Sequence, residues 1–278
     1  MDILQYTFFQ NALVGILLIS VVAAIIGTYI VTRRMVFIAG GLTHASFGGL
    51  GIGYFAGVSP TFSALIFATA TALGIELTSR TKRIREDSAI ALFWAVGMAV
   101  GIIFIFLTPG YTPGLSEFLF GNILTITTTD IALFAIYTLA LVLYVTVQYR
   151  PILYTAFDTD FARIQGIKTS HINTIMMLFI AIGVVLSIRL IGIMLLMSVL
   201  TLPQIIAELY TSRYKTMMIL SGSVCLAGSV VGLFMSAIIA VPTGACIVVV
   251  LVVLYAIAKA IHALYTRTLR NKSMNIRQ

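Results

Sequence analysis

From Ile3 to Thr32 the chain contains no charged residue, and Arg33 and Arg34 follow directly. The same alternation of long apolar stretches with short basic ones continues through the 278 residues, of which only 9% are charged. A soluble protein cannot bury the apolar surface that a mean hydropathy of +1.09 implies, whereas a helix of about 20 apolar residues spans a bilayer. The sequence therefore predicts an all-α, polytopic integral membrane protein.

The apolar stretches divide into about nine predicted membrane-spanning helices. Their approximate ranges are 10–32, 39–57, 60–79, 88–107, 129–149, 171–188, 191–209, 216–239 and 243–263. They fill residues 1–265, which form one predicted transmembrane domain, and a basic tail follows at 266–278. No part of the chain is left for a soluble domain, so an ATPase or a large receptor would have to be another polypeptide.

The Lys and Arg residues predict the orientation in the membrane. If Arg33 and Arg34 are cytoplasmic, all 17 of them except Arg189 fall on the same side, in agreement with the positive-inside rule. The N-terminus is then outside, and the C-terminus and its tail are cytoplasmic. This distribution and contact with anionic lipids of the bilayer explain the net charge of +8, which gives no argument for nucleic-acid binding.

Two segments on the predicted outer side are unusual. Residues 108–128 are too apolar for a solvated loop, so we expect a short re-entrant or interfacial helix there. A single helix over 171–209 would be about 58 Å long, which is too long for the bilayer. We therefore expect a tight outer turn near Arg189. The alternative is that Arg189 is a functional charge inside the membrane.

The predicted span 39–57 contains the main candidate for chemistry, His44. Small residues recur along this span at a spacing of four, which predicts a face where another helix approaches closely; they are Gly41, Ala45, Gly49, Gly53 and Gly57. His44 lies on a different stripe, between Gly40 and Gly48, which predicts open space around the imidazole. A neutral imidazole suits Zn, Mn or Fe-type divalent ions. The alternative is a packing histidine bonded to a neighbouring carbonyl group.

The segment 150–170 is expected at the cytoplasmic face. One helical face carries Phe157, Phe161 and Ile164, and small or acidic residues recur at a spacing of four at Asp158, Ala162 and Gly166. This pattern is typical of a short amphipathic helix. Such a helix either docks into a groove on a partner or lies on the lipid surface.

Together these segments resemble the permease subunit of metal ABC importers, the family that takes up zinc, manganese or iron. The most specific piece is RRMVFIAGGLTHASFGG, from Arg33 to Gly49, which is similar to the family's Arg-rich turn followed by F-x-G-D-A-x-S-H-A-x-x-x-G. Further similar pieces, in chain order, are DSAI from Asp87, FLFGN from Phe118, the residues Asp160, Ala162 and Gly166, and the run from Ile191 to Pro203. Gly40 stands where the family has an aspartate.

The resemblance implies import of a divalent metal ion, with zinc ahead of manganese and iron. His44 would line the metal pathway, and the segment that couples to the ATPase would include Asp158, Asp160, Ala162 and Gly166. Two copies would form a homodimer on two ABC ATPase subunits in the bacterial inner (cytoplasmic) membrane, and an extracytoplasmic metal-binding protein would deliver the ion. The chain would hold no permanently bound cofactor. It would not itself be an enzyme, since it has no G-x-x-x-x-G-K-[ST] phosphate loop.

Two other classes of protein remain as alternatives. An ATP-independent secondary transporter or channel for a cation would need more acidic residues in the middle of its spans than the sequence provides. An intramembrane enzyme would need a His–Asp or paired-carboxylate arrangement, and His44 has no plausible acidic partner at its depth.

Overall fold

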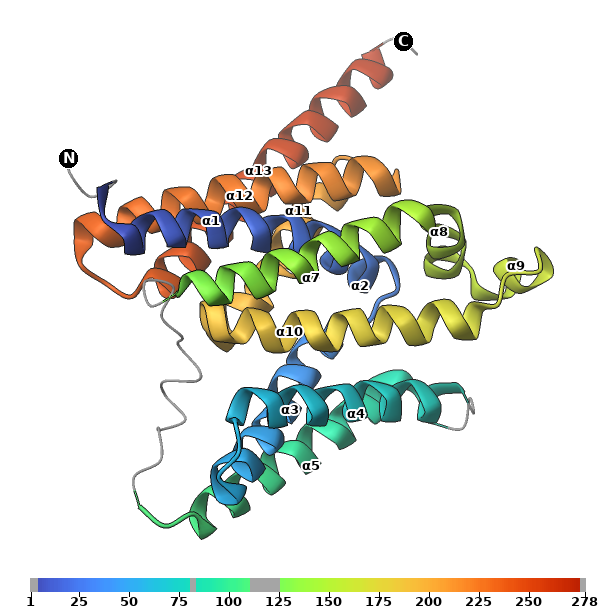
Figure 1. Ribbon diagram of the computed structural model, residues 1–278. Coiled ribbons are helices and arrows are strands. Elements are labelled where there is room, and N and C mark those ends of the chain that lie inside the picture. Colours follow the sequence, from blue (N-terminus) through green and yellow to red (C-terminus); the bar gives the residue numbers. More distant parts are fainter. Residues whose placement is uncertain (1–4, 81–83, 111–125, 276–278) are drawn as a thin grey trace.

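The computed structural model describes residues 5–80, 84–110 and 126–275, and these residues form helices and short connections without a strand. The predicted all-α class is therefore confirmed for the described part of the chain (Figure 1). The helices are α1 (Thr7–Val22), the π-helix η2 (Ala23–Gly27), α2 (Thr28–Thr32), α3 (Phe37–Ala56), α4 (Pro60–Arg80), α5 (Glu86–Leu107), α7 (Thr128–Val147), α8 (Tyr149–Phe157), α9 (Thr159–Ile164), α10 (Thr169–Val199), α11 (Leu202–Glu208), α12 (Tyr214–Ile239) and α13 (Thr243–Asn275).

Seven helical segments in the described part of the chain are long and apolar enough to cross a membrane, so the protein is multi-pass. They are Thr7–Thr32, Pro60–Arg80, Glu86–Leu107, Thr128–Val147, Thr169–Glu208, Tyr214–Ile239 and Thr243–Thr266. The predicted number of about nine differs for two reasons. The stretch 169–208 counts as one segment, and α3, although it is 20 residues long, contains glycines and His44 and does not reach the hydropathy of the seven segments.

The stretch 169–208 is not one straight helix. Within α10 the backbone leaves the helical conformation at Gly192, where φ is 74° and ψ is 171°. α10 then ends at Val199, and α11 begins with Pro203 in its first turn. Glycine tolerates a positive φ that a side chain would oppose. The chain therefore breaks close to Arg189, where a turn was expected, although the break lies three residues later.

Helices α3, α4 and α5 pack closely together, and α10 lies against both α3 and α4 (Figure 1). A Cβ atom added at Gly49 would lie 2.6 Å from the Cα atom of Ala64, and one at Gly53 would lie 2.8 Å from that of Pro60. Gly41 similarly leaves room for Ile90 of α5. α3 therefore contacts α5 through one part of its small-residue stripe and α4 through another.

Gly57, the last residue of the predicted stripe, differs from the others. It ends α3 with a φ of 66°, and no described atom lies within 4 Å of the place where its Cβ would be. The left-handed conformation satisfies the last carbonyl groups of the helix, since the Val58 N–H donates to the Gly53 carbonyl at 3.1 Å. Gly57 therefore turns the chain toward α4 and does not itself admit a neighbouring helix.

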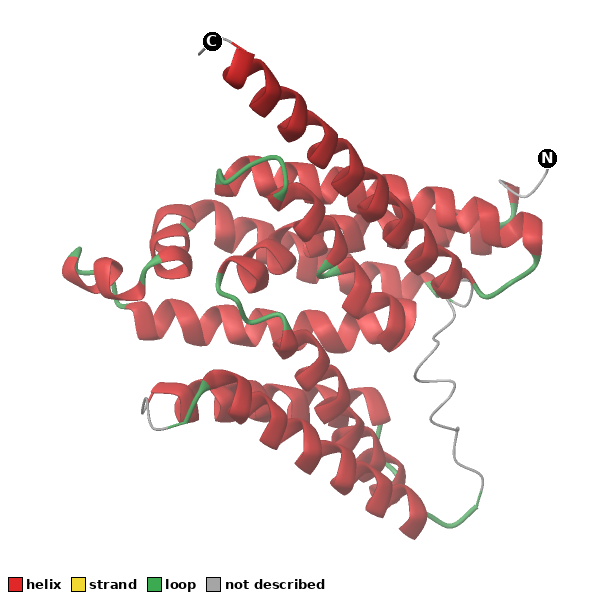
Figure 2. Cartoon of the chain, turned by 180° about the vertical axis from the view of Figure 1, so that it is seen from behind, coloured by secondary structure: helices red, strands yellow, loops and turns green. Residues whose placement is uncertain are grey.

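Two predicted segments extend beyond the described residues. The expected short helix at 108–128 lies almost entirely in 111–125, outside the described residues. The tail at 266–278 begins as a continuation of α13, which is helical to Asn275. The last turns of α13 extend beyond the other helices in both views (Figures 1 and 2).

Candidate metal pathway and docking segment

His44 lies in α3 and is only partly buried. Its imidazole ring stacks on the indole ring of Trp94 in α5, with ring centroids 4.5 Å apart and planes 7° from parallel. This aromatic contact covers one face of the imidazole and leaves its edge, which carries the two nitrogens, for other partners. The sequence alone could not show this contact, because it joins two helices that are separated along the chain by the whole of α4.

The predicted open space around His44 is wrong. A Cβ at Gly40 would lie 2.8 Å from Cε of Met197 and 3.5 Å from the Trp94 ring. A Cβ at Gly48 would lie 2.8 Å from the carbonyl oxygen of Gly97. Both glycines are instead points where neighbouring elements come close, so His44 sits between packed helices.

The described residues contain no cluster of three or more His, Cys, Asp or Glu side chains that could hold a metal ion. An ion at His44 would therefore complete its coordination with water, backbone carbonyls or weaker donors.

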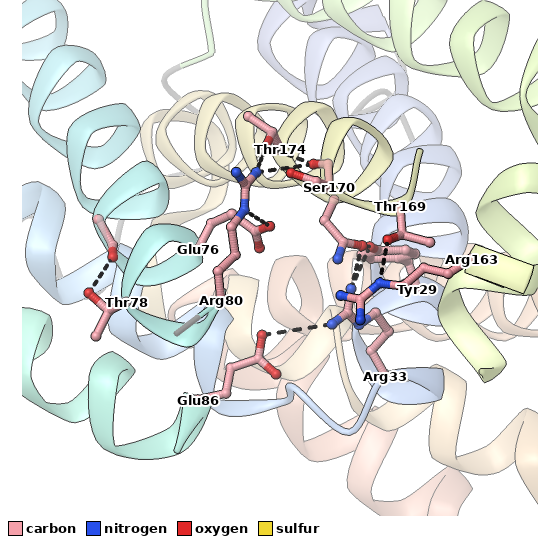
Figure 3. Close-up of polar contacts among 12 residues, drawn as sticks. Tyr29, Arg33, Glu76, Thr78, Arg80, Glu86, Arg163, Thr169, Ser170 and Thr174 are labelled. Carbon is pink, nitrogen blue, oxygen red and sulfur yellow. Dashed lines mark hydrogen bonds and ion pairs between the residues drawn. The ribbon is translucent and has the colours of Figure 1, made fainter. Parts of the chain in front are cut away.

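At one end of the bundle, Arg33 is fixed against α10 (Figure 3). Its Nη1 donates to Oδ1 of Asn173 at 2.5 Å and to the Tyr29 hydroxyl at 3.2 Å. The Tyr29 hydroxyl donates to the same Asn173 oxygen at 3.1 Å, and Glu86 of α5 approaches Arg33 at 4.0 Å. Arg33, which follows α2, thus connects the first residue of α5 to the start of α10. Neither Tyr29 nor Asn173 was singled out from the sequence.

Arg80 makes a second connection at the same end. Its Nε lies 3.1 Å from Glu76 Oε1, four residues earlier in α4. Its Nη2 donates to the Thr174 hydroxyl at 2.5 Å and to the Ser170 carbonyl at 3.2 Å, both in α10 (Figure 3). A surface hollow of about 640 Å³ beside this contact is also lined by Arg163 and Lys168. The segment 150–170 therefore lies at the same end as Arg33 and Arg80.

The segment 150–170 forms α8 and the short helix α9. The Asp158 side chain caps α9 by accepting from the backbone N–H groups of Asp160 and Phe161 at 3.0 and 2.9 Å. Ala162 is fully buried and faces the chain's own core, whereas Ile164 is 83% exposed. Gly166 follows α9 with a φ of 77° and no described atom within 4 Å of the place of a Cβ. The exposed surface of this segment is therefore formed by the apolar side chains of α9 and by Gly166.

Arg189 lies at the opposite end of α4 from Arg80. Its Nε forms an ion pair of 2.8 Å with Asp130 in the first turn of α7, and its Nη1 donates to the Thr61 hydroxyl at 3.4 Å. The Arg189 side chain is half exposed. Of the two interpretations made from the sequence, this arrangement favours a residue at a bundle end over a charge buried in mid-membrane.

Comparison with known proteins decides the family. The profile of the ABC 3 transport family matches residues 5–262. The chain belongs to the ABC 3 transport family. It is thus a membrane permease of the ABC transporter type, and the family assignment made from the sequence is confirmed.

Relatives of this ABC 3 permease extend over nearly its whole length. The manganese transport system membrane protein MntC of Halalkalibacterium halodurans is 32% identical over 257 residues, which are 92% of this chain and 88% of that protein. An uncharacterized membrane protein of Synechocystis is 34% identical over 92% of each chain. The solved structure of PsaBC from Streptococcus pneumoniae in complex with Fab superposes with a TM-score of 0.80 at 27% identity, over 92% of both chains.

Proposed function

We propose that this permease carries a divalent transition metal ion into the cytoplasm, with zinc foremost and manganese and iron as alternatives, at the cost of ATP hydrolysed on a partner subunit. The observation that carries the proposal is the family match over residues 5–262. Relatives named for manganese transport support a metal as the substrate. The metal itself is treated as cargo, and no permanently bound cofactor is proposed.

His44 is the proposed pathway residue. It is the histidine nearest the middle of a helix of spanning length, it is only partly buried, and its ring is oriented by Trp94. An orienting contact reduces the reorganisation needed when an ion arrives. The packing role that the sequence left open would instead leave transport unchanged when the imidazole is removed.

We assign the end that carries Arg33, Arg80 and the segment 150–170 to the cytoplasm, as the positive-inside rule favours. The N-terminus is then outside and the C-terminus inside. Asp158, Asp160, Ala162 and Gly166 belong to the proposed coupling segment, in which Asp158 caps α9 and Ala162 anchors it to the core. The exposed apolar side chains of α9 dock on a cytoplasmic ABC ATPase subunit.

The proposed assembly is a homodimer of the permease on two ATPase subunits in the bacterial inner membrane. A metal-loaded extracytoplasmic binding protein delivers the ion at the Arg189 end. The family match and the likeness to PsaBC support an assembly with a partner ATPase.

Co-purification of a co-expressed ABC ATPase subunit tests the docking part of the proposal. We expect Gly166→Arg to abolish co-purification, because it places a long cation on the free surface beside α9. Gly166→Ala is the matched control, since it carries the same strain at a φ of 77° without the bulk. Retention of the ATPase by the arginine variant would remove this segment from the interface.

A further inference from the structure

Met197 occupies the space that a side chain at position 40 would need, one turn of α3 away from His44. Gly40 and His44 are four residues apart, on one face of α3. The Cε atom of Met197 lies 2.8 Å, and its sulfur 3.5 Å, from the place of a Cβ at Gly40. The side chain of an aspartate at position 40 would begin at this Cβ position. In this chain a thioether is therefore found where such a carboxylate would project.

The break at Gly192 explains how Met197 reaches this place. α10 changes direction there, and the turns that follow pack against α3. The backbone at Met197 is held by the Thr201 hydroxyl, which donates to its carbonyl oxygen at 2.8 Å. The Met197 side chain therefore projects from a hydrogen-bonded turn near the end of α10.

Met197 differs from the methionines that fill the core. Met35, Met176 and Met177 are no more than 2% exposed. Met197, His44 and Trp94 are all only partly buried, so each of the three side chains keeps some exposed surface. Met98 and Met218 are also only partly buried but pack against the buried core, whereas Met197 packs beside Gly40 of α3.

From this geometry, and resting on the proposed metal transport, we infer that Met197 is a specificity-determining residue of the pathway. With His44 it offers an imidazole nitrogen and a thioether sulfur, where a carboxylate at position 40 would supply oxygen. Carboxylate ligands suit manganese, whereas imidazole and thioether ligands suit zinc and softer ions. The site therefore favours zinc over manganese.

Uptake by the reconstituted transporter, complete with ATPase and binding protein, tests this inference. The binding protein is loaded with zinc or with manganese in separate reactions, so that its own selectivity does not enter the comparison. We expect Met197→Leu to lower zinc uptake by about tenfold, as loss of a ligand-shell group does, and to change manganese uptake by less than about twofold. Met194→Leu is the matched control, because Met194 lies on the same helix but is 54% exposed.

A gain-of-function variant keeps the inference falsifiable if the leucine variant folds poorly. Gly40→Asp combined with Met197→Ala provides a carboxylate and the room for it, and it should raise manganese uptake relative to zinc. Equal effects of Met197→Leu on both metals, or an unchanged metal ratio in the double variant, would overturn the role of Met197 while leaving metal transport intact. Absence of uptake of any metal by the wild type would overturn the proposed function itself.

Discussion

Gln204 shows how a single buried polar group can organise the centre of the molecule. Its side chain is fully buried, and Nε2 donates to the carbonyl oxygen of Ala23 at 2.6 Å. Ala23 begins the π-helix η2, and Gly27 at its end leaves the room that the amide fills. In a membrane a backbone group without a partner is costly. The amide therefore fastens α11 to the first span.

Replacing Gln204 with methionine keeps its length but removes the donor. We expect the free energy of unfolding to fall by about 1 kcal/mol, because the Ala23 carbonyl oxygen loses a partner, while removal of the buried Gln204 Oε1, which has no partner among the described residues, offsets part of the cost. Thermal unfolding of the purified protein in detergent measures the effect. Gln165→Met is the control, since Gln165 is exposed. Equal melting temperatures for both variants would show that the contact contributes nothing.

At the scale of the elements, α3 is defined by its neighbours. Its glycines bring backbone atoms of α4 within contact, and its C-terminal Gly57 and the Pro60 that begins α4 set the turn between them. The spacing of the small residues predicted a packing face. It could not show that the face is shared by two helices, because a spacing of four contains no information about which helix lies opposite.

Gly49→Leu should separate α3 from α4. The place of its Cβ lies 2.5 Å from the Ser63 carbonyl oxygen and 2.6 Å from the Ala64 Cα, and backbone atoms cannot move aside cheaply. We expect a loss of about 1–3 kcal/mol or more in stability, visible as a lower melting temperature or poor recovery from membranes. Ala56→Leu, on the exposed end of the same helix, should have no effect. Wild-type behaviour of Gly49→Leu would contradict the close approach.

Across the whole molecule, the positions of the apolar stretches are the feature that the sequence predicted best. The apolar length of each stretch located α4 and α5 to within two residues of their observed ends, since 60–79 and 88–107 were expected. Contacts between elements far apart in the chain could not be predicted, because hydropathy indicates which residues are buried and not which residues they contact. Trp94 over His44 and Met197 beside Gly40 depend on such contacts, as does the inward direction of Ala162.

The proposed orientation predicts which exposed positions face each side of the membrane. Ser59 lies between α3 and α4, and Ser212 lies between α11 and α12, at opposite ends of the bundle, and both are exposed. In intact cells, a membrane-impermeant maleimide should label Ser59→Cys and should label Ser212→Cys only after permeabilisation. The two native cysteines are buried and give a low background. The reverse pattern would invert the topology.

The central claim is that the chain moves a metal ion at the expense of ATP hydrolysed by its partner. It is tested most directly by metal uptake into proteoliposomes that hold the complete transporter with its binding protein, with and without ATP, for the wild type and His44→Ala. We expect uptake that requires ATP and that falls by at least about tenfold in the variant, with assembly intact. Uptake that proceeds without ATP would instead identify a secondary transporter or channel, and wild-type uptake by His44→Ala would make the histidine a packing residue.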